Sequence, residues 1–352
     1  MARSHLAMPI CPTCEAFFPT ILGLTNHTKT ECSRWTKSQS FEIVMLQCDG
    51  TKNKFGGCDL PIEAIAKLAK SCFKSLKDDS VFKMLLAPEF FFWNDLGSPK
   101  GAFSSKEVSQ CFSTMAKVSA GVGKVLLVPG TVPVADSFAF QDLKTHYKHL
   151  EGVKIMNKEL LPEGVAREYL NEEWTGQLEY TSKAKKAFSY RNVLGGFYDG
   201  RKIIEYHKQI PYTSSSDFEY HWFLDEDAMV MGLPPIENRR SSVVVGGVKL
   251  GFEICAEHQY GTLMAFGDGP PDVHILLANS MEEYFDQLVY TPPAGGLFAH
   301  VDAKEEHCQL YYAKDGKLAL VKPKETLVLK EKGFSGTILY YEEKLRIPVR
   351  FV

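Results

Sequence analysis

The segment Val248-Lys-Leu-Gly-Phe-Glu-Ile-Cys-Ala-Glu-His258 decides the fold class, because it joins a buried strand to a turn. Its first part, up to Ile254, has the length and the aliphatic content of a buried β-strand. The chain is expected to turn at Cys255. A nucleophile on a strand-to-helix turn lies at the edge of a sheet, near backbone N–H groups that stabilise an oxyanion. This geometry alone fits several kinds of hydrolase.

Further strands and helices are predicted on both sides of this segment. Two segments, 60–76 and 107–118, carry apolar residues near a 3.6-residue period and predict helices. Strands that alternate with helices indicate an α/β layered sandwich. Residues 318–352 predict β-hairpins, with turns at 331–334 and 341–344. The other apolar runs with the pattern of buried strands are 41–47, 81–87, 124–129, 241–245 and 273–278.

The composition excludes several classes of protein. The chain has 352 residues, 45% hydrophobic and 24% charged, as expected of a globular protein with a substantial core. The formal net charge of -3 argues against a globally basic nucleic-acid binder. No apolar run is long enough to span a membrane, and the first ten residues lack the apolar core of a secretory signal. A cytoplasmic or nuclear location is therefore expected.

The nine cysteines are unevenly spread, and their odd number does not suit a disulfide scaffold. Four potential metal ligands near the start have the spacing C-x2-C-x12-H-x4-C, which suits a tetrahedral zinc site. Phe18 and Leu24 occupy the positions of the small core of a ββα finger. The alternative is that these thiols are incidental members of a disordered tail. The predicted ligands of a structural zinc ion are Cys11, Cys14, His27 and Cys32.

The sequence predicts two domains. Residues 1–38 form the zinc-finger-like segment and its linker, with the polar stretch 33–40 as the linker. Few positive charges accompany the finger, so a docking or stabilising role is favoured, and contact with protein or nucleic acid is the open question. Residues 39–352 form the larger domain. Within it, residues 141–186 are rich in Lys, Glu and Tyr and are interpreted as a partly helical insertion.

Three fragments carry the candidate chemistry. The run Leu85-Leu-Ala-Pro-Glu-Phe-Phe-Phe-Trp93 brings Glu89 from the end of a strand into an aromatic setting, which suits a general base. The run Lys202-Ile-Ile-Glu-Tyr-His-Lys208 ends a strand with a lysine, and the segment quoted first supplies Cys255. Each residue also has a structural interpretation: a helix cap, a surface strand end or an inert buried thiol.

These fragments together resemble the nitrilase superfamily of carbon–nitrogen hydrolases, which use Glu, Lys and Cys in that order, each at the end of a core strand. The resemblance covers residues 40–352 and rests on Pro88-Glu89, His207-Lys208 and Glu253-Ile-Cys-Ala-Glu257. Lesser landmarks are residues 41–49, 191–192 and 277–280. The resemblance implies a four-layer α-β-β-α sandwich of nitrilase type, in addition to the small ββα finger.

The resemblance also implies the chemistry. Glu89 would deprotonate Cys255, the thiolate would attack an amide or nitrile carbon, and Lys208 would stabilise the oxyanion. A small-molecule amide is favoured over a nitrile by analogy with most of the superfamily. No cofactor is expected for catalysis, and a homodimer or higher oligomer is open. The candidate substrate-binding residues are Glu219, which is preferred to Asp217, together with Phe90, Glu257 and Asn279.

Three departures limit the analogy. The insertion lengthens the interval between Glu89 and Lys208 and is expected to act as a lid. The run after Cys255 lacks the usual arginine or aromatic and proline, and residues 290–296 replace part of a long helix. Two rivals remain: a binding module on a hydrolase-like scaffold, and an acyltransferase that uses the same cysteine. A cysteine protease with a Cys255–His258 dyad ranks below them.

Overall fold

The computed structural model describes residues 36–52, 57–96, 101–139, 186–208, 227–231, 240–263, 268–281, 295–314, 317–331 and 334–348. The predicted finger, most of the insertion and Glu219 lie outside the described residues. The domain division at residue 38 therefore stays a prediction.

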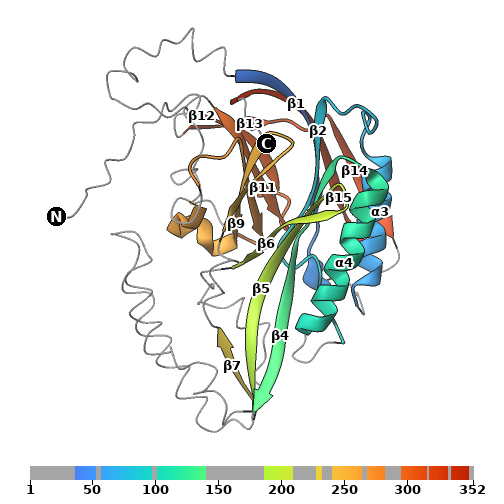
Figure 1. The fold of residues 1–352 in the computed structure, drawn as a ribbon, viewed down its shortest axis with the longest axis vertical. Helices are drawn as coiled ribbons and strands as arrows, with labels where there is room; N and C mark the ends of the chain where they lie inside the picture. Colours follow the sequence, from blue (N-terminus) through green and yellow to red (C-terminus); the bar gives the residue numbers. More distant parts are fainter. Residues whose placement is uncertain are drawn as a thin grey trace, which may run out of the picture.

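The described residues form two β-sheets that face each other, with helices on the outer face of the first (Figure 1). The first sheet has the order β14-β15-β1-β2-β3-β5-β4, and β6 and β7 pair with β5. Its strands are β1 (Thr36–Gln47), β2 (Val81–Ala87), β3 (Val125–Pro129), β4 (Thr131–Ala139), β5 (Lys186–Tyr198), β6 (Arg201–His207), β7 (Asp227–Met231), β14 (Glu325–Glu331) and β15 (Phe334–Pro348).

The second sheet carries the predicted nucleophile and has the order β13-β12-β11-β10-β9-β8. Parallel pairing joins β9, β10 and β11, and the strands on either side pair antiparallel. Its strands are β8 (Ser242–Val245), β9 (Val248–Ile254), β10 (Val273–Ala278), β11 (Gly296–Asp302), β12 (Gln309–Lys314) and β13 (Lys317–Val321).

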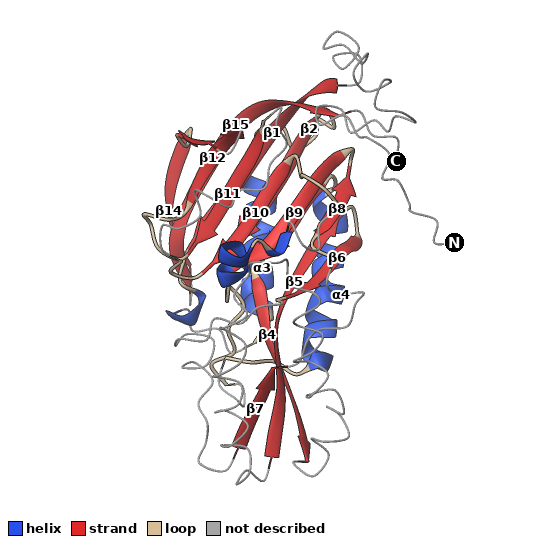
Figure 2. Ribbon diagram, turned by 90° about the vertical axis from the view of Figure 1, so that its left-hand side faces the viewer, coloured by secondary structure: helices blue, strands red, loops and turns tan. Residues whose placement is uncertain are grey.

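Two α-helices cover the outer face of the first sheet, as Figure 2 also shows. Helix α3 (Asp59–Ser71) buries Ile62, Ile65 and Leu68, which follow the helical period. Helix α4 (Ser105–Val122) begins with a capping box between Ser104 and Glu107. Two short 3-10 helices, η1 (Gly50–Lys52) and η5 (Cys255–Tyr260), follow β1 and β9.

Two apolar clusters hold these layers together. One lies between the helices and the first sheet and includes Val44, Leu85 and Phe112. The other lies between the two sheets and includes Met84, Phe252 and Ile275. The alternation of side chains along β1 and β2 sends neighbouring residues of these strands to opposite clusters. Within the described residues, the two helices, the first sheet and the second sheet thus form three layers of the predicted α/β sandwich.

The predicted strands 81–87, 248–254 and 273–278 agree with β2, β9 and β10. Two other predictions are wrong. The stretch from Thr36 to Ser40 is not a linker, because it forms the start of β1 and pairs antiparallel with Lys344–Pro348 of β15. Residues 341–344 are not a turn, because β15 runs through them. The exposed residues Glu342 and Lys344 alternate there with residues that are buried or half-buried, as expected of a strand with one face on the core.

Candidate active site

Glu89 lies in a turn directly after β2, and its carboxylate is almost fully buried, with 1% of the residue exposed. Its Oε1 accepts a hydrogen bond from Lys208 Nζ at 2.9 Å and another from Asn192 Nδ2 at 2.8 Å. The Lys208 side chain has no exposed surface. Because both charges are withdrawn from water, each strongly stabilises the other. The first two residues of the predicted triad are therefore in direct contact.

The turn that carries Glu89 is tightly enclosed. Phe90 has a φ of 58°, in the left-handed region that non-glycine residues rarely adopt. Its N–H donates to Thr131 Oγ1 at 2.9 Å. A Cβ on Gly130 would lie 2.2 Å from Pro88 O, and one on Gly50 would lie 1.8 Å from Phe90 O. Only glycines fit on both sides of this turn, so the packing fixes the direction of the Glu89 side chain.

Lys208 follows β6, and its position is set by the neighbouring strand β5. Its backbone N–H donates to Asn192 O at 2.9 Å, which extends the pairing of β5 and β6 by one residue. The side chain of Asn192 thus fixes Glu89, and its backbone carbonyl fixes Lys208. From the sequence, Asn192 is only a minor landmark of the resemblance. The signal that could have marked it is a polar residue that directly precedes the apolar residues Val193 and Leu194.

Cys255 is the first residue after β9 and the first residue of η5. It is 8% exposed, and its φ of 49° places it in the left-handed region. This is the sharp strand-to-helix turn that the sequence predicts. Such strained residues persist only where the surroundings hold them.

Glu257 holds this turn and ties it to the first sheet. Its Oε2 accepts from the backbone N–H of Ile254 at 2.8 Å, and its Oε1 accepts from the hydroxyl of Tyr206 at 2.9 Å. Burial and the Glu257 carboxylate raise the pKa of Tyr206, so the hydroxyl keeps its proton. Tyr206 precedes Lys208 by two residues, and Glu257 follows Cys255 by two. Lys208 and Cys255 therefore flank a hydrogen bond that joins the two sheets.

The other predicted substrate-binding residues have different settings. The Phe90 ring is buried beside Trp93, with ring centroids 6.0 Å apart. Asn279 is half-buried and follows β10, next to Ser280, whose N–H donates to Asp302. The roles of these residues stay predictions, as does the role of Glu219.

A second buried polar cluster lies beside the Cys255 turn and was not predicted. Glu253 Oε2 contacts His258 Nδ1 at 2.6 Å and His274 Nε2 at 2.9 Å, and its Oε1 accepts from the backbone N–H of Leu263 at 2.7 Å. Burial acts to raise the pKa of Glu253, but His258 and His274 outweigh it and lower that pKa to about 2. Burial lowers the pKa of His274. The three side chains place their potential ligand atoms within 4.8 Å of one another.

These shifts predict a loss of stability in acid. The folded pKa of Glu253 lies below its ordinary value of about 4.3, so its stabilisation is present above that pH and is lost as the pH falls towards 2. The lowered pKa of His274 acts in the same direction, because only the unfolded chain takes up that proton below about pH 6.5. We expect the melting temperature to fall from pH 7 to pH 3, and to fall less steeply in Glu253→Gln. Glu63→Gln, an exposed change on α3, should keep the wild-type slope. A melting temperature constant over this range would contradict the prediction.

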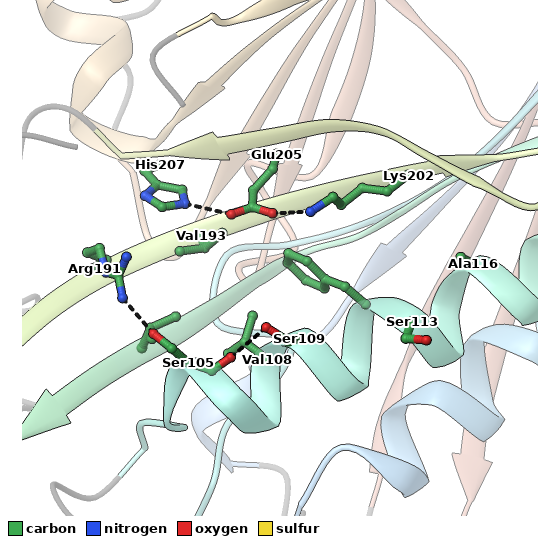
Figure 3. Close-up of a pocket in the computed structure, with 12 residues that line it drawn as sticks. Ser105, Val108, Ser109, Ser113, Ala116, Arg191, Val193, Lys202, Glu205 and His207 are labelled. Carbon is green, nitrogen blue, oxygen red and sulfur yellow. Dashed lines mark hydrogen bonds and ion pairs between the residues drawn. The ribbon is translucent and has the colours of Figure 1, made fainter. Parts of the chain in front are cut away.

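A pocket of about 370 Å³ lies between α4 and strands β4, β5 and β6 (Figure 3). Arg191, Val193 and His207 line it, and they alternate with Asn192 and Lys208 along β5 and β6. The pocket therefore lies on the opposite face of these strands from the Glu89–Lys208 pair. Glu205 Oε1 contacts His207 Nε2 at 3.0 Å, and this contact, with Lys202 adding to it, lowers the pKa of Glu205 to about 2 against the effect of burial.

None of the helices in the described part of the chain is long and apolar enough to cross a membrane.

No family model matches the sequence, and no curated protein sequence matches it. Among solved structures, the chain is similar to a mutant of an amidase of Nesterenkonia AN1 from the nitrilase superfamily, with 12% identity over 88% of this chain and 90% of that chain and a TM-score of 0.43.

Two further solved structures are similar at the same level. A glutamine-dependent NAD+ synthetase from Acinetobacter baumannii has 11% identity over 89% of this chain and 48% of that chain, with a TM-score of 0.42. Saccharomyces cerevisiae Nit3, a member of branch 10 of the nitrilase superfamily, has 11% identity over 86% and 90%, with a TM-score of 0.41. These scores are low, so the chemistry of this chain rests on its own side chains.

Proposed function

We propose that this chain hydrolyses a non-peptide carbon–nitrogen bond, an amide in preference to a nitrile, through Glu89, Lys208 and Cys255. The observation that carries the proposal is the buried contact between Lys208 Nζ and Glu89 Oε1, at strand ends joined by the Tyr206–Glu257 hydrogen bond to the turn of Cys255. A carboxylate, an ammonium and a thiol at converging strand ends are the groups that thiol-dependent acyl transfer requires.

The reaction has two halves. In the first, Glu89 takes the Sγ proton of Cys255, and the thiolate forms a bond to the carbonyl carbon. Lys208 stabilises the resulting oxyanion. The C–N bond then breaks, and Glu89 returns the proton to the leaving amine, which leaves a thioester on Cys255. In the second half, Glu89 takes a proton from water, and the hydroxide forms a bond to the thioester carbon. The C–S bond then breaks, Glu89 returns the proton to the sulfur, and the carboxylic acid leaves a regenerated Cys255 thiol.

The proposed substrate contacts are Glu219, Phe90, Glu257 and Asn279. Because both oxygens of Glu257 already accept hydrogen bonds, any contact with substrate shares this carboxylate with the Cys255 turn. We further propose that Cys11, Cys14, His27 and Cys32 bind a structural zinc ion, which would give the chain a separate site for contact with protein or nucleic acid.

The test is the rate at which iodoacetamide alkylates Cys255, measured by intact mass and peptide mapping at pH 7. Cys72 is the internal reference, because it is half-buried and burial raises its pKa. We expect Cys255 to react at least about tenfold faster than Cys72, since a neighbouring lysine favours the thiolate. Lys208→Ala should remove this advantage, and Cys255→Ala should abolish the fast label.

Fast labelling would be followed by a screen of small aliphatic and aromatic amides for release of ammonia. Equal labelling rates for Cys255 and Cys72, unchanged by Lys208→Ala, would overturn the proposal.

A further inference from the structure

We propose that Glu253 is a positioning residue for the nucleophile, and that it acts by binding His258 and His274 around the turn of Cys255. This inference rests on the function proposed above. Glu253 lies two residues before Cys255 in β9, and His258 lies three residues after it in η5. Neither residue is needed to explain the Glu89–Lys208–Cys255 chemistry.

The contacts of Glu253 span the whole turn. Its Oε1 binds the N–H of Leu263, beyond the end of η5, and its Oε2 binds His258 within η5. The same Oε2 binds His274 in the neighbouring strand β10. One carboxylate therefore connects the strand before the nucleophile, the helix after it and the next strand of the sheet.

The face of the sheet on which Glu253 lies separates this network from the proposed chemistry. Side chains alternate along β9, so Glu253 points to the face of the strand opposite to that of its neighbours Phe252 and Ile254. Glu253 thus acts on Cys255 through the backbone of the turn. Glu257 supplies the complementary support, because it binds Ile254 N and reaches Tyr206 of the first sheet.

Strain at Cys255 explains why the turn requires such support. A non-glycine residue in the left-handed region is strained and relaxes unless its neighbours prevent it. Hydrogen bonds to a charged acceptor are stronger than those between neutral groups. The three bonds to Glu253, which is 1% exposed, therefore oppose relaxation of the turn in which Cys255 has a φ of 49°.

The imidazole rings are themselves held in place. Phe298 stacks on His258 with ring centroids 5.3 Å apart, and it meets His274 edge-on at 5.0 Å. Both residues are fully buried. The 2.6 Å and 2.9 Å contacts share one carboxylate oxygen and are hydrogen-bond distances. They indicate direct bonds from the imidazoles, although the same three groups could also serve as metal donors.

The experiment compares alkylation of Cys255 by iodoacetamide, from pH 5 to pH 9, in full-length wild type, Glu253→Gln, Glu253→Ala and His258→Gln. Melting temperatures are measured in parallel. We expect the rate at Cys255 to fall by about tenfold or more in Glu253→Ala and His258→Gln at every pH, because a misplaced nucleophile reacts poorly. Glu253→Gln keeps the shape of the side chain and should retain an intermediate rate. Alkylation of Cys72 should be unchanged.

His300→Gln is the matched control. His300 is a fully buried histidine of the same sheet, in β11, and its ring lies 6.2 Å from that of Phe298, but its carboxylate contact is with Asp302 and not with Glu253. We expect His300→Gln to lower the melting temperature and to leave the Cys255 rate within about twofold of wild type. If Cys255 is alkylated as fast in the Glu253 variants as in wild type, the positioning role is wrong. The role is also wrong if the Glu253 variants and His300→Gln lose the same melting temperature and slow the alkylation of Cys255 equally.

Two further outcomes are distinguishable. If wild-type Cys255 reacts no faster than Cys72, the proposed function fails and the positioning role fails with it. If a chain with Cys11→Ser and Cys14→Ser still binds one zinc ion, and Glu253→Gln releases it, a metal and not hydrogen bonds holds the turn, which overturns the inference as stated.

Discussion

Replacement of Glu89 by glutamine is expected to lower turnover of the best amide substrate by at least about 10³-fold, because it removes the group that we propose moves the proton in both halves of the reaction. The measurement is the initial rate of ammonia release. Glu342→Gln is the matched control: Glu342 is exposed on β15 and contacts Lys74, so the same chemical change there should leave turnover unaltered.

The same variant is expected to unfold more easily, which must be separated from the loss of chemistry. In Glu89→Gln the ammonium of Lys208 stays buried without its carboxylate, at a cost of about 3–5 kcal/mol. The double variant Glu89→Gln, Lys208→Met removes both charges and should recover most of the free energy of unfolding, while turnover stays abolished. Recovery of turnover in the double variant, or full activity in Glu89→Gln, would exclude Glu89 as the base.

The second large effect is expected from Gly50→Ala, which changes no titratable group of the site but presses on the turn that carries Glu89. A Cβ at Gly50 would meet three backbone atoms, at 1.8 Å from Phe90 O, 2.6 Å from Phe90 C and 2.8 Å from Phe91 Cα. Backbone cannot move aside as a flexible side chain does, so the turn that carries Glu89 must shift. We expect a loss of about 3 kcal/mol in the free energy of unfolding, measured by urea denaturation.

The displaced turn should also impair the site. A shift of about 1 Å at Glu89 is expected to lower the turnover about 10²-fold in the protein that remains folded. Gly121→Ala is the control, because Gly121 lies in α4 with no atom within 4 Å of the added Cβ. It should be neutral or slightly stabilising, since alanine favours the helix. Equal stability of the two variants would show that the Glu89 turn tolerates movement.

The parts of the fold that the sequence predicts well are those whose side chains are buried on both faces. Strands β2, β9 and β10 are mainly apolar and almost wholly buried, and their bounds agree with the predictions. The missed regions depend on a distant partner. The polar start of β1 is extended because β15 pairs with it, and the sequence of residues 36–40 does not predict that pairing.

The candidate site likewise has a part that the sequence predicts and a part that depends on distant partners. The order and setting of Glu89, Lys208 and Cys255 along the chain predict that their strand ends converge, and the structure brings Glu89 and Lys208 into contact. The support of each group was not predicted. Asn192 lies beside Lys208 only through the register of β5 with β6, and Glu253 meets His274 only because β9 and β10 are neighbours. Such partners depend on tertiary geometry, which residue spacing does not encode.

The pairing of β1 with β15 has a consequence for biosynthesis. These two strands are separated by most of the chain, so their contacts have a high contact order and form late. As the chain leaves the ribosome, β2 can cover one edge of β1 early, but the other edge stays open until β15 emerges. That edge carries the apolar run Ile43-Val-Met-Leu46, which is the kind of segment that aggregates. Yield in the cell is therefore expected to depend on chaperones that shield an unpaired strand during translation.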